Sequence, residues 1–352
     1  MGIGSGEPAG DGSAALAGTV GSPDEWSVML GRRLVFPSVL LLATVGLAAC
    51  SGSSSAPESS ASGSGGGKTV GFLVFNAELD TFVTALVDAV QQSAQAKGMQ
   101  VTVVDGKDDS ATQIAAVQQF ITDGVDAILL YPGDPTTLVP VVQEAADKGI
   151  PVFTVNLNLQ QGAPIVTYIG SKDYDYGYKQ GELLVKAIGE SGNVGWLTGT
   201  PGTSAEIDRS AGFKDAIKAY PGIVIVDQQA DDWANDKALS DVQAWVASDA
   251  GAIDAVVAQG PEVAGAAEWA KAQGLDIAFI AGDYPTELKQ AIEDGAVYGT
   301  VAQYPQEQGE RAIDTIFRWL SGGQDTVQRP AEYTGLPVVT AENAADTPAA
   351  YE

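Results

Sequence analysis

The stretch that decides the fold is Thr69–Val104, TVGFLVFNAELDTFVTALVDAVQQSAQAKGMQVTVV. Its first six residues are an apolar run of strand length. The next segment carries apolar side chains at helical spacing, including Phe82 and Leu86, and stops at Gly98. Gln100–Val104 is a second short apolar run. This order predicts a strand, a helix and a second strand, the repeating unit of an α/β fold.

The same alternation continues along the chain. In the first half we predict helices at 111–122 and 138–148, and strands at 127–130 and 151–155. In the second half we predict strands at 165–169, 194–197, 223–226, 255–258, 278–281 and 299–302, and helices at 174–189, 205–219, 236–247, 263–272 and 287–293. Continuous apolar strands between amphipathic helices indicate parallel sheets covered on both faces.

The sequence therefore predicts an α/β fold of two similar, doubly wound parallel-sheet lobes. A hinge with several chain crossings, near Gly170 and near Gln303, would join them. We expect the N-terminal lobe to contain residues 68–170 plus 304–333, and the C-terminal lobe residues 171–303 plus 334–352. Together these lobes have about 285 residues, enough for two cores of ordinary size.

The segment before the lobes has the pattern of an export signal. Arg32 and Arg33 precede an apolar run, residues 34–47, that ends in Leu47-Ala48-Ala49-Cys50. This order is typical of a signal peptide, and Leu-Ala-Ala-Cys resembles the bacterial lipobox, in which the cysteine is acylated. We predict a signal region at 1–49, with the true start at Met29. A plain secretory signal and an uncleaved anchor are the alternatives.

Cys50 is the only cysteine of the 352 residues, so no disulfide can form within the chain. The residues after it, up to 67, are nearly all Ser, Gly and Ala and are typical of a flexible tether. We therefore expect a lipidated Cys50 and a protein outside the cytoplasm, lipid-anchored to the outer face of the cell membrane or periplasmic.

The chain is strongly acidic, with a net charge of −27. The first 49 residues carry two arginines and four acids, so the chain from Cys50 onward has a net charge of −25. Such a surface repels phosphate backbones, and we expect no nucleic-acid partner. The absence of histidine excludes Ser-His-Asp and Cys-His catalysis and every His-ligated metal site. We expect no cofactor and no metal.

Polar and aromatic side chains follow many of the predicted strands. Parallel sheets of this kind bind ligands beyond the carboxyl ends of their strands. The candidate ligand-binding residues are Asn76, Asp80, Phe82, Tyr131 and Asn156 in the first half, and Arg209, Trp233, Glu262, Asp283 and Gln303 in the second.

Several of these positions lie in segments that carry a family resemblance. Gly199–Ala205 reads Gly-Thr-Pro-Gly-Thr-Ser-Ala and is followed by Arg209 and Gly212-Phe213, while Gly282-Asp283 and Val301–Pro305 follow in order. They resemble the Gly-Thr-Ser-Ala, Arg, Gly-Phe, Phe-Asp and Ala-Gln-x-Pro segments of the type I periplasmic sugar-binding proteins, the ribose- and galactose-binding family of ABC importers. The resemblance covers residues 68 to about 339.

The resemblance implies a function and a set of roles. Phe82 and Trp233 would clamp the faces of a sugar ring, and Asp283 and Arg209 would contact its hydroxyls, with Gln303 near the hinge and Asp80 on the wall of the first half. Apolar C–H faces stack on rings, and hydroxyls need fixed polar partners. The chain would be a monomeric solute-binding lipoprotein that closes on its ligand and delivers it to ABC permease subunits.

The chain also departs from the ribose-type pattern. Asn156-Leu157 stands where ribose-type proteins carry Asp-Arg, Gly260-Pro261 with Glu262 nearby stands where they carry Asn-Asp, and Tyr131 replaces a polar amide. A hydroxyl without its partner costs about 1 to 3 kcal/mol, so these changes alter ligand choice. We expect a different pentose or hexose, a polyol or a modified sugar.

Other interpretations stay open at this point. A sensory lipoprotein that presents its ligand to a receptor would have the same binding site. A glycosidase could use two carboxylates such as Glu262 and Asp283, because that chemistry needs no histidine. Individual residues also have purely structural alternatives: Phe82 could belong to the core, Asp283 could cap the following helix, and Arg209 could be a solvated helix residue.

Overall fold

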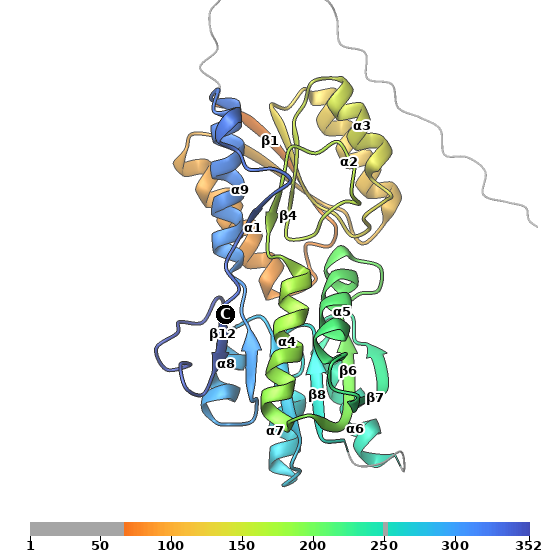
Figure 1. Ribbon diagram of the computed structural model, residues 1–352. Helices are drawn as coiled ribbons and strands as arrows, with labels where there is room; N and C mark the ends of the chain where they lie inside the picture. The colour runs from red at the N-terminus through yellow and green to blue at the C-terminus, as the bar shows by residue number, and fades with distance from the viewer. Residues whose placement is uncertain (1–66, 249–252) are drawn as a thin grey trace, which may run out of the picture. The chain divides into compact units, whose positions relative to one another are not determined.

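A computed structural model describes residues 67–248 and 253–352. The predicted signal region, Cys50 and nearly all of the tether lie outside the described residues. The described chain forms two six-stranded sheets, each with helices on both faces (Figure 1). In this part of the chain no helix is long and apolar enough to cross a membrane.

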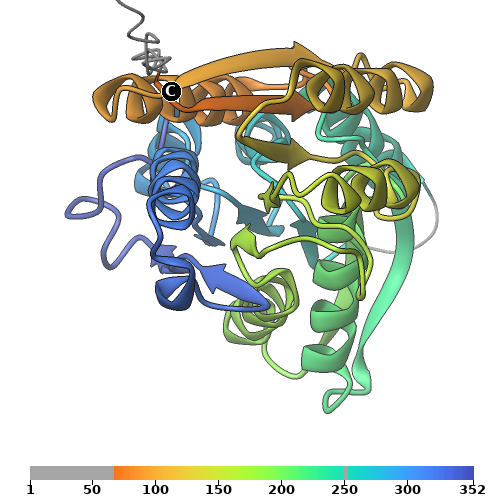
Figure 2. The ribbon, with the colours of Figure 1, turned by 90° about the horizontal axis from the view of Figure 1, so that it is seen from above.

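The first sheet has the strand order β11-β5-β4-β3-β1-β2. Its strands are β1 (Thr69–Val74), β2 (Gln100–Asp105), β3 (Ala127–Tyr131), β4 (Val152–Val155), β5 (Tyr168–Gly170) and β11 (Ala331–Tyr333). The helices that pack on it are α1 (Thr81–Ala96), α2 (Ser110–Asp123), α3 (Val139–Asp147) and α9 (Pro305–Leu320). Helix α9 lies beside α1, and Figure 2 shows it nearly along its axis.

The second sheet has the order β12-β10-β9-β8-β6-β7. Its strands are β6 (Ser191–Thr198), β7 (Gly222–Ala230), β8 (Ala255–Ala258), β9 (Ala278–Gly282), β10 (Gly299–Val301) and β12 (Val338–Thr340). Its helices are α4 (Asp173–Ile188), α5 (Ser204–Ile217), α6 (Asn235–Ala247), α7 (Ala264–Ala272) and α8 (Thr286–Glu293). A short 3-10 helix, η1 (Gln324–Thr326), precedes β11.

Strand alternation decides which helices each strand residue meets. On β1, Phe72 and Val74 pack with α1 and α9, whereas Leu73 points to the opposite face and packs with α2 and α3. The second sheet is filled in the same way, with α4 and α5 on one face and α6, α7 and α8 on the other. Both faces of both sheets are therefore covered, which is why the strands read as continuous apolar runs.

The structure confirms the α/β architecture and corrects details. The pairing between β10 and β12 is antiparallel, while the other paired strands in the described chain run parallel. The strand predicted at 165–169 begins only at Tyr168, because Ile165 N–H donates to the carbonyl of Ala163 in a tight turn. Strands β6 and β7 also run further into polar sequence than predicted.

The chain passes between the two sheets three times. The passages follow β5 at Gly170, follow β10 at Val301, and link β11 to β12 through residues 334–337. The first two lie at the positions expected from the sequence, near Gly170 and Gln303. The third follows from the return of the last strand to the second sheet.

Helices α4 and α5 approach each other closely through glycines. A β-carbon at Gly177 of α4 would lie 1.9 Å from the carbonyl oxygen of Arg209 on α5. A β-carbon at Gly212 of α5 would lie 1.9 Å from the carbonyl oxygen of Tyr174. Both contacts are with backbone atoms, so a larger side chain would push the helices apart. This close approach holds the Arg209 end of α5 against α4.

We predict that Gly177→Ala destabilises the protein by about 1 to 3 kcal/mol, because the added methyl group cannot fit without separating two helices. Chemical denaturation measures this free energy of unfolding. The matched control is Gly265→Ala in α7, where an added β-carbon meets no atom within 4 Å. It should stabilise by about 0.5 to 1 kcal/mol, the usual difference between Ala and Gly in a helix. Equal effects of the two substitutions would contradict the packing argument.

Candidate functional site

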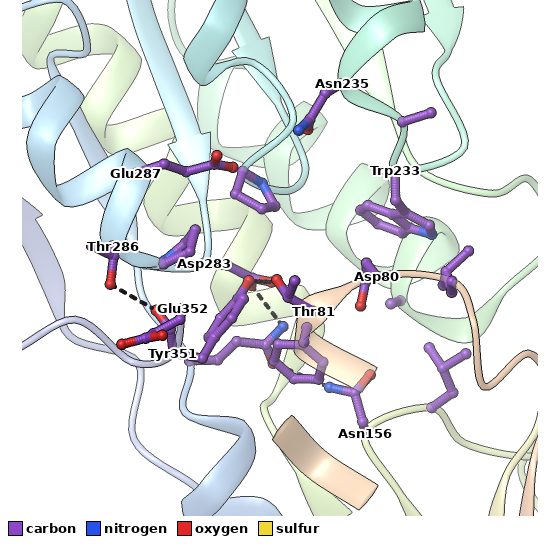
Figure 3. A pocket seen from close by; sticks show the side chains of 18 of the residues that line it. Asp80, Thr81, Asn156, Trp233, Asn235, Asp283, Thr286, Glu287, Tyr351 and Glu352 are labelled. Atoms are coloured by element: carbon purple, nitrogen blue, oxygen red, sulfur yellow. Dashed lines mark hydrogen bonds between the residues drawn. The ribbon is translucent and has the colours of Figure 1, made fainter. Parts of the chain in front are cut away.

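A cavity of about 1030 Å³ lies between the carboxyl ends of the two sheets (Figure 3). Eight of the ten candidate residues line it, namely Asp80, Phe82, Tyr131, Asn156, Arg209, Trp233, Asp283 and Gln303. They come from the ends of strands of both sheets, from the loops that follow them, and from the N-terminal halves of helices α1 and α5. The fold therefore brings together side chains that are up to 223 positions apart in the sequence.

Asn76 and Glu262 do not line the cavity. The Asn76 side chain stays in its own loop, where its oxygen accepts a hydrogen bond of 3.1 Å from the backbone N–H of Glu78. Glu262 is 1 % exposed, and its Oε1 accepts from the backbone N–H of Gly260 at 3.2 Å. Since Glu262 is buried away from the cavity, the pair Glu262 and Asp283 does not flank a site for a glycosidic bond.

Asp283 lies at the base of the cavity with its carboxylate surrounded by donors. Its Oδ1 accepts hydrogen bonds from the Tyr176 hydroxyl at 2.9 Å and from Gln303 Nε2 at 2.7 Å. Its Oδ2 accepts from the Tyr351 hydroxyl at 3.2 Å. Burial raises the pKa of Asp283, and the nearby charge of Arg209 opposes that rise. Asp283 does not cap α8, whose N-cap residue is Pro285.

Arg209 is 3 % exposed, so it is not a solvated helix residue. Its Nε donates to Asp173 Oδ1 at 2.8 Å, and its Nη1 donates to the carbonyl of Gln259 at 2.9 Å. The guanidinium lies over the Tyr176 ring, 3.9 Å from the centroid. Burial by itself would lower the pKa of Arg209, but Asp173 and its other partners raise it overall. The side chain is thus a fixed cation at the cavity wall.

Gln303 uses its amide within the protein. Its Oε1 accepts from Asn156 Nδ2 at 3.3 Å, from Ser171 Oγ at 3.0 Å and from Gln308 Nε2 at 2.9 Å. Its Nε2 donates to Asp283. Gln303 therefore connects the end of β4 and two of the hinge passages to Asp283. Its role in the site is to hold these groups in place.

The wall formed by the first sheet combines one acid with aromatic rings. Asp80 caps α1, because its Oδ1 accepts from the backbone N–H of Val83 at 2.8 Å, and burial raises its pKa to about 6. Phe82 is 4 % exposed and belongs to the core as well as to the cavity wall. The Tyr131 ring packs edge-on against Phe75 with centroids 5.4 Å apart.

Trp233 lies on the opposite wall in a tight loop. Asp232 and Trp233 have φ angles of 54° and 64°, in the left-handed region, and Asp231 Oδ1 accepts from the Trp233 backbone N–H at 3.1 Å. The Trp233 ring lies on the backbone of Gly199, where an added β-carbon would be 1.8 Å from a ring atom. This support fixes the ring orientation toward the cavity.

Sequence reasoning missed several residues of the site. Tyr176 and Asp173 on α4 orient Asp283 and Arg209, Gln308 on α9 binds Gln303, and Tyr351 reaches Asp283 from the last residues of the chain. Of these residues, only Gln308 lies close to a matched motif, three residues after the Val301–Pro305 segment. The position of Tyr351 depends on the path of the chain after β12, which no local pattern encodes.

Comparisons with known proteins place the chain in a family. A family model described as "Periplasmic binding protein domain" matches residues 70–324. A ribose import binding protein of Bacillus subtilis is 30 % identical over 252 residues, 71 % of this chain and 81 % of that protein. A xylitol-binding protein of Mycolicibacterium smegmatis is 28 % identical over 301 residues, 85 % of this chain and 83 % of that protein.

A solved structure agrees with this assignment. The periplasmic binding protein component of the arabinose ABC transporter from Shewanella sp. ANA-3, bound to α- and β-L-arabinofuranose, has a TM-score of 0.73 at 31 % identity. The match covers 79 % of this chain and 94 % of that one. This chain belongs to the periplasmic binding protein family. The type I resemblance read from the sequence and the two-lobe α/β fold are both confirmed.

Within this periplasmic binding protein, the departure at Gly260 has a structural reason. A β-carbon at Gly260 would lie 2.4 Å from Glu262 Oε2 and 3.1 Å from an atom of the Trp233 ring. A residue with a β-carbon, such as the asparagine of ribose-type proteins, would therefore displace the Glu262 carboxyl group and press on the Trp233 ring. Glycine at this position lets the Trp233 ring and the buried Glu262 carboxyl group both approach the backbone of residue 260.

Glu262 forms a buried pair with Asp231 below the Trp233 loop. Asp231 is 0 % exposed, and in the described chain neither Asp231 Oδ2 nor Glu262 Oε2 has a hydrogen-bond donor. Burial raises the pKa of Asp231, and the charge of Glu262 raises it further; burial also raises the pKa of Glu262. Two buried carboxyl groups in contact are stable when they share a proton, so the pair retains one above the pH at which a lone carboxyl loses it.

We predict that Asp231→Asn stabilises the protein at pH 8 by at least about 1 kcal/mol, because the amide can donate to Glu262 without a shared proton. A carboxyl pKa that is raised in the folded state makes the free energy of unfolding fall as pH rises above about 4. Denaturation of the natural protein at pH 5 and pH 8 should show this fall, and Asp231→Asn should reduce it. Asp232→Asn, at a residue that pairs with Lys237 at the surface, is the control. The same pH dependence in both variants would argue against a shared proton.

Proposed function

We propose that the protein captures a neutral sugar or sugar alcohol in the cavity between its lobes, as the solute-binding lipoprotein of an ABC importer. The observation that carries the proposal is the convergence of eight of the ten candidate residues on one cavity, with the aromatic rings of Phe82 and Trp233 and the polar groups of Arg209, Asp283 and Asn156. The ribose, xylitol and arabinose proteins named above support a polyhydroxylated ligand.

The charge of the cavity favours an uncharged ligand. Five acids line it, namely Asp80, Asp236, Asp283, Glu287 and Glu352. Among the described lining residues, Arg209 is the one base, and it is already paired with Asp173 at 2.8 Å. A phosphorylated or carboxylated sugar would bring another negative charge into this field, which opposes binding.

Some polar atoms at the cavity have donor or acceptor capacity that the protein's own hydrogen bonds do not use, and these atoms can bind ligand hydroxyl groups. The side-chain amide nitrogen of Asn156 donates to Gln303 and Gln308, which leaves the side-chain oxygen Oδ1 as an acceptor. Arg209 retains N–H donors beyond the two that bind Asp173 and Gln259. A hydroxyl both donates and accepts, so a polyol can satisfy both kinds of group, while its C–H face lies on Trp233.

The mechanism in this proposal is hinge closure. The lobes comprise residues 68–170 plus 304–333 and residues 171–303 plus 334–352, and they would rotate about the three passages near Gly170, Gln303 and 334–337. Ligand contacts from both walls would favour the closed form. The closed form would then dock on the membrane permease.

We predict that neutral sugars or sugar alcohols raise the melting temperature of the protein and that their charged counterparts do not. A thermal-shift screen would compare D-glucose with D-glucuronate, D-galactose with D-galacturonate, and myo-inositol with myo-inositol phosphate. Xylitol would be included as a further neutral compound. A ligand present at 100 times its Kd adds about 2.7 kcal/mol of stability. Shifts with the anionic members alone, or with none of the compounds, would overturn the proposal.

Trp233→Ala locates the binding in this cavity. Loss of a stacking ring should weaken the binding of any ligand found in the screen by at least about 1 kcal/mol, or roughly fivefold in Kd. Tyr298→Ala, at an exposed tyrosine that does not line the cavity, is the control and should leave Kd unchanged. Equal affinity of both variants would place the ligand elsewhere.

The proposed anchor is tested at Cys50. We predict that Cys50→Ser releases the full-length protein from membranes when it is expressed in a bacterial host, because serine cannot take the thioether-linked lipid. Immunoblots of membrane and soluble fractions measure the distribution. Replacement of Ser51 by Ala is the control and should leave the protein in the membrane fraction. Retention of the Cys50→Ser variant in the membrane fraction would mean that another segment anchors the chain.

A further inference from the structure

The last described segment of the chain returns to the cavity and is fixed there by backbone hydrogen bonds. The Ala350 N–H donates to the carbonyl of Tyr284 at 2.7 Å, and the Thr286 N–H donates to the carbonyl of Tyr351 at 2.9 Å. Tyr351 also forms a parallel β-bridge with Pro285. The residues that receive the segment, 284–286, directly follow Asp283. Tyr351 is therefore held at a defined place beside that carboxylate.

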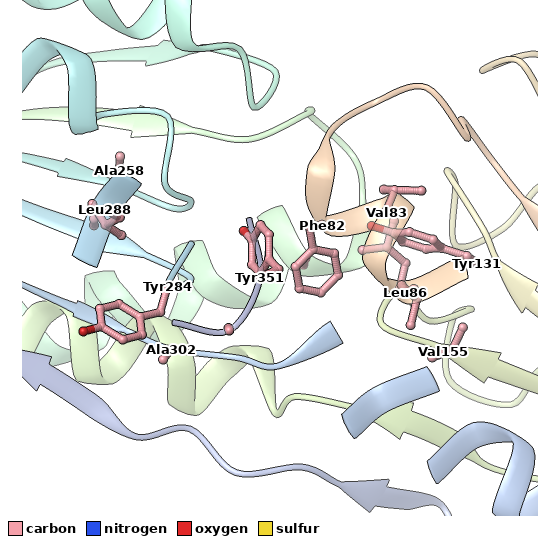
Figure 4. Packing of buried hydrophobic residues seen from close by; sticks show 14 of the residues in the cluster. Phe82, Val83, Leu86, Tyr131, Val155, Ala258, Tyr284, Leu288, Ala302 and Tyr351 are labelled. Atoms are coloured by element: carbon pink, nitrogen blue, oxygen red, sulfur yellow. The ribbon is translucent and has the colours of Figure 1, made fainter. Parts of the chain in front are cut away.

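The Tyr351 side chain contacts both lobes. It is 6 % exposed, and its hydroxyl donates to Asp283 Oδ2 at 3.2 Å. Its ring packs edge-on against the Phe82 ring, with centroids 5.5 Å apart and an angle of 87° between the planes (Figure 4). Phe82 and Asp283 are two of the residues that we propose to hold the ligand. Tyr351 fills the corner between them.

The hydroxyl also changes what Asp283 can offer to a ligand. A carboxylate has about four acceptor positions, and Tyr176, Gln303 and Tyr351 together use three of them. Without Tyr351, Oδ2 would face the cavity and could accept a ligand hydroxyl. The Tyr351 side chain therefore occupies the position at Asp283 that an additional hydroxymethyl group of a ligand could otherwise take.

We propose that Tyr351 is a specificity-determining residue, whose ring and hydroxyl close the corner between Phe82 and Asp283 and restrict the site to ligands without a further hydroxymethyl group at that corner. This inference rests on the proposed function and names the ligand class more narrowly: five-carbon sugars or sugar alcohols are favoured over their six-carbon counterparts.

Tyr351→Ala tests the inference by isothermal titration with matched pairs: D-xylose with D-glucose, L-arabinose with D-galactose, and xylitol with sorbitol. The members of each pair differ by one carbon that bears a hydroxyl. The natural protein should prefer the five-carbon member of the pair it binds. The variant should shift the ratio of Kd values toward the six-carbon member by at least about tenfold, the usual discrimination for one such group.

Tyr351→Phe distinguishes the effect of the ring from that of the hydroxyl. It keeps the edge-on contact with Phe82, so the size preference should stay within about threefold of that of the natural protein. If the alanine variant does not fold, Tyr351→Leu serves as a second variant with a side chain smaller than tyrosine. It should shift the ratio of Kd values in the same direction. Tyr298→Ala, outside the cavity, should leave the ratio unchanged.

The outcomes distinguish this inference from the proposed function. Binding by the natural protein with the same five- to six-carbon ratio in Tyr351→Ala and Tyr351→Leu would overturn the role of Tyr351 and leave the sugar-binding proposal standing. A natural protein that prefers six-carbon ligands would also overturn the inference alone. Absence of binding to any member of the three pairs and of the thermal-shift screen would overturn both.

Discussion

The buried carboxylate of Asp283 is the group on which the site depends. It accepts hydrogen bonds from Tyr176, Gln303 and Tyr351, which are 107, 20 and 68 positions away in the chain. A buried carboxyl group without such partners is very costly, so helix α4, the hinge and the last segment must all be in place for Asp283 to be buried. The same requirement fixes the base of the cavity before any ligand arrives.

Arg209 is held by a related constraint. Glycines at the crossing of α4 and α5 bring the two helices into backbone contact, and this places the guanidinium between Asp173 and the Tyr176 ring. The cation and Asp283 then share a poorly solvated region, in which each moderates the unfavourable burial of the other. Groups that are fixed in this way lose little conformational freedom on binding, which favours affinity for a small ligand.

Periodicity and strand-end position predicted much of this arrangement. Short apolar runs and amphipathic segments gave the strands and helices, because the side-chain periods of both elements are local properties. These patterns did not distinguish residues that face the cavity from residues that lie behind its wall. Asp80 caps helix α1, whereas Asp283 does not cap α8, and Glu262 binds the backbone of Gly260 instead of facing the cavity. Side-chain direction in a loop depends on its φ and ψ angles, which the sequence pattern does not give.

The sequence by itself determined the α/β class, the two-fold repetition of the pattern, the acidic charge and the set of loops that meet at the cavity. These follow from composition and from periods of two and 3.6 residues, which need no knowledge of distant contacts. Only the tertiary structure decided that Asp231 and Glu262 form a buried pair, that Gln303 serves Asp283, and that Tyr351 closes a corner of the cavity. Each of these contacts joins segments brought together by the sheets and the hinge, so its energy exists only after the chain has folded.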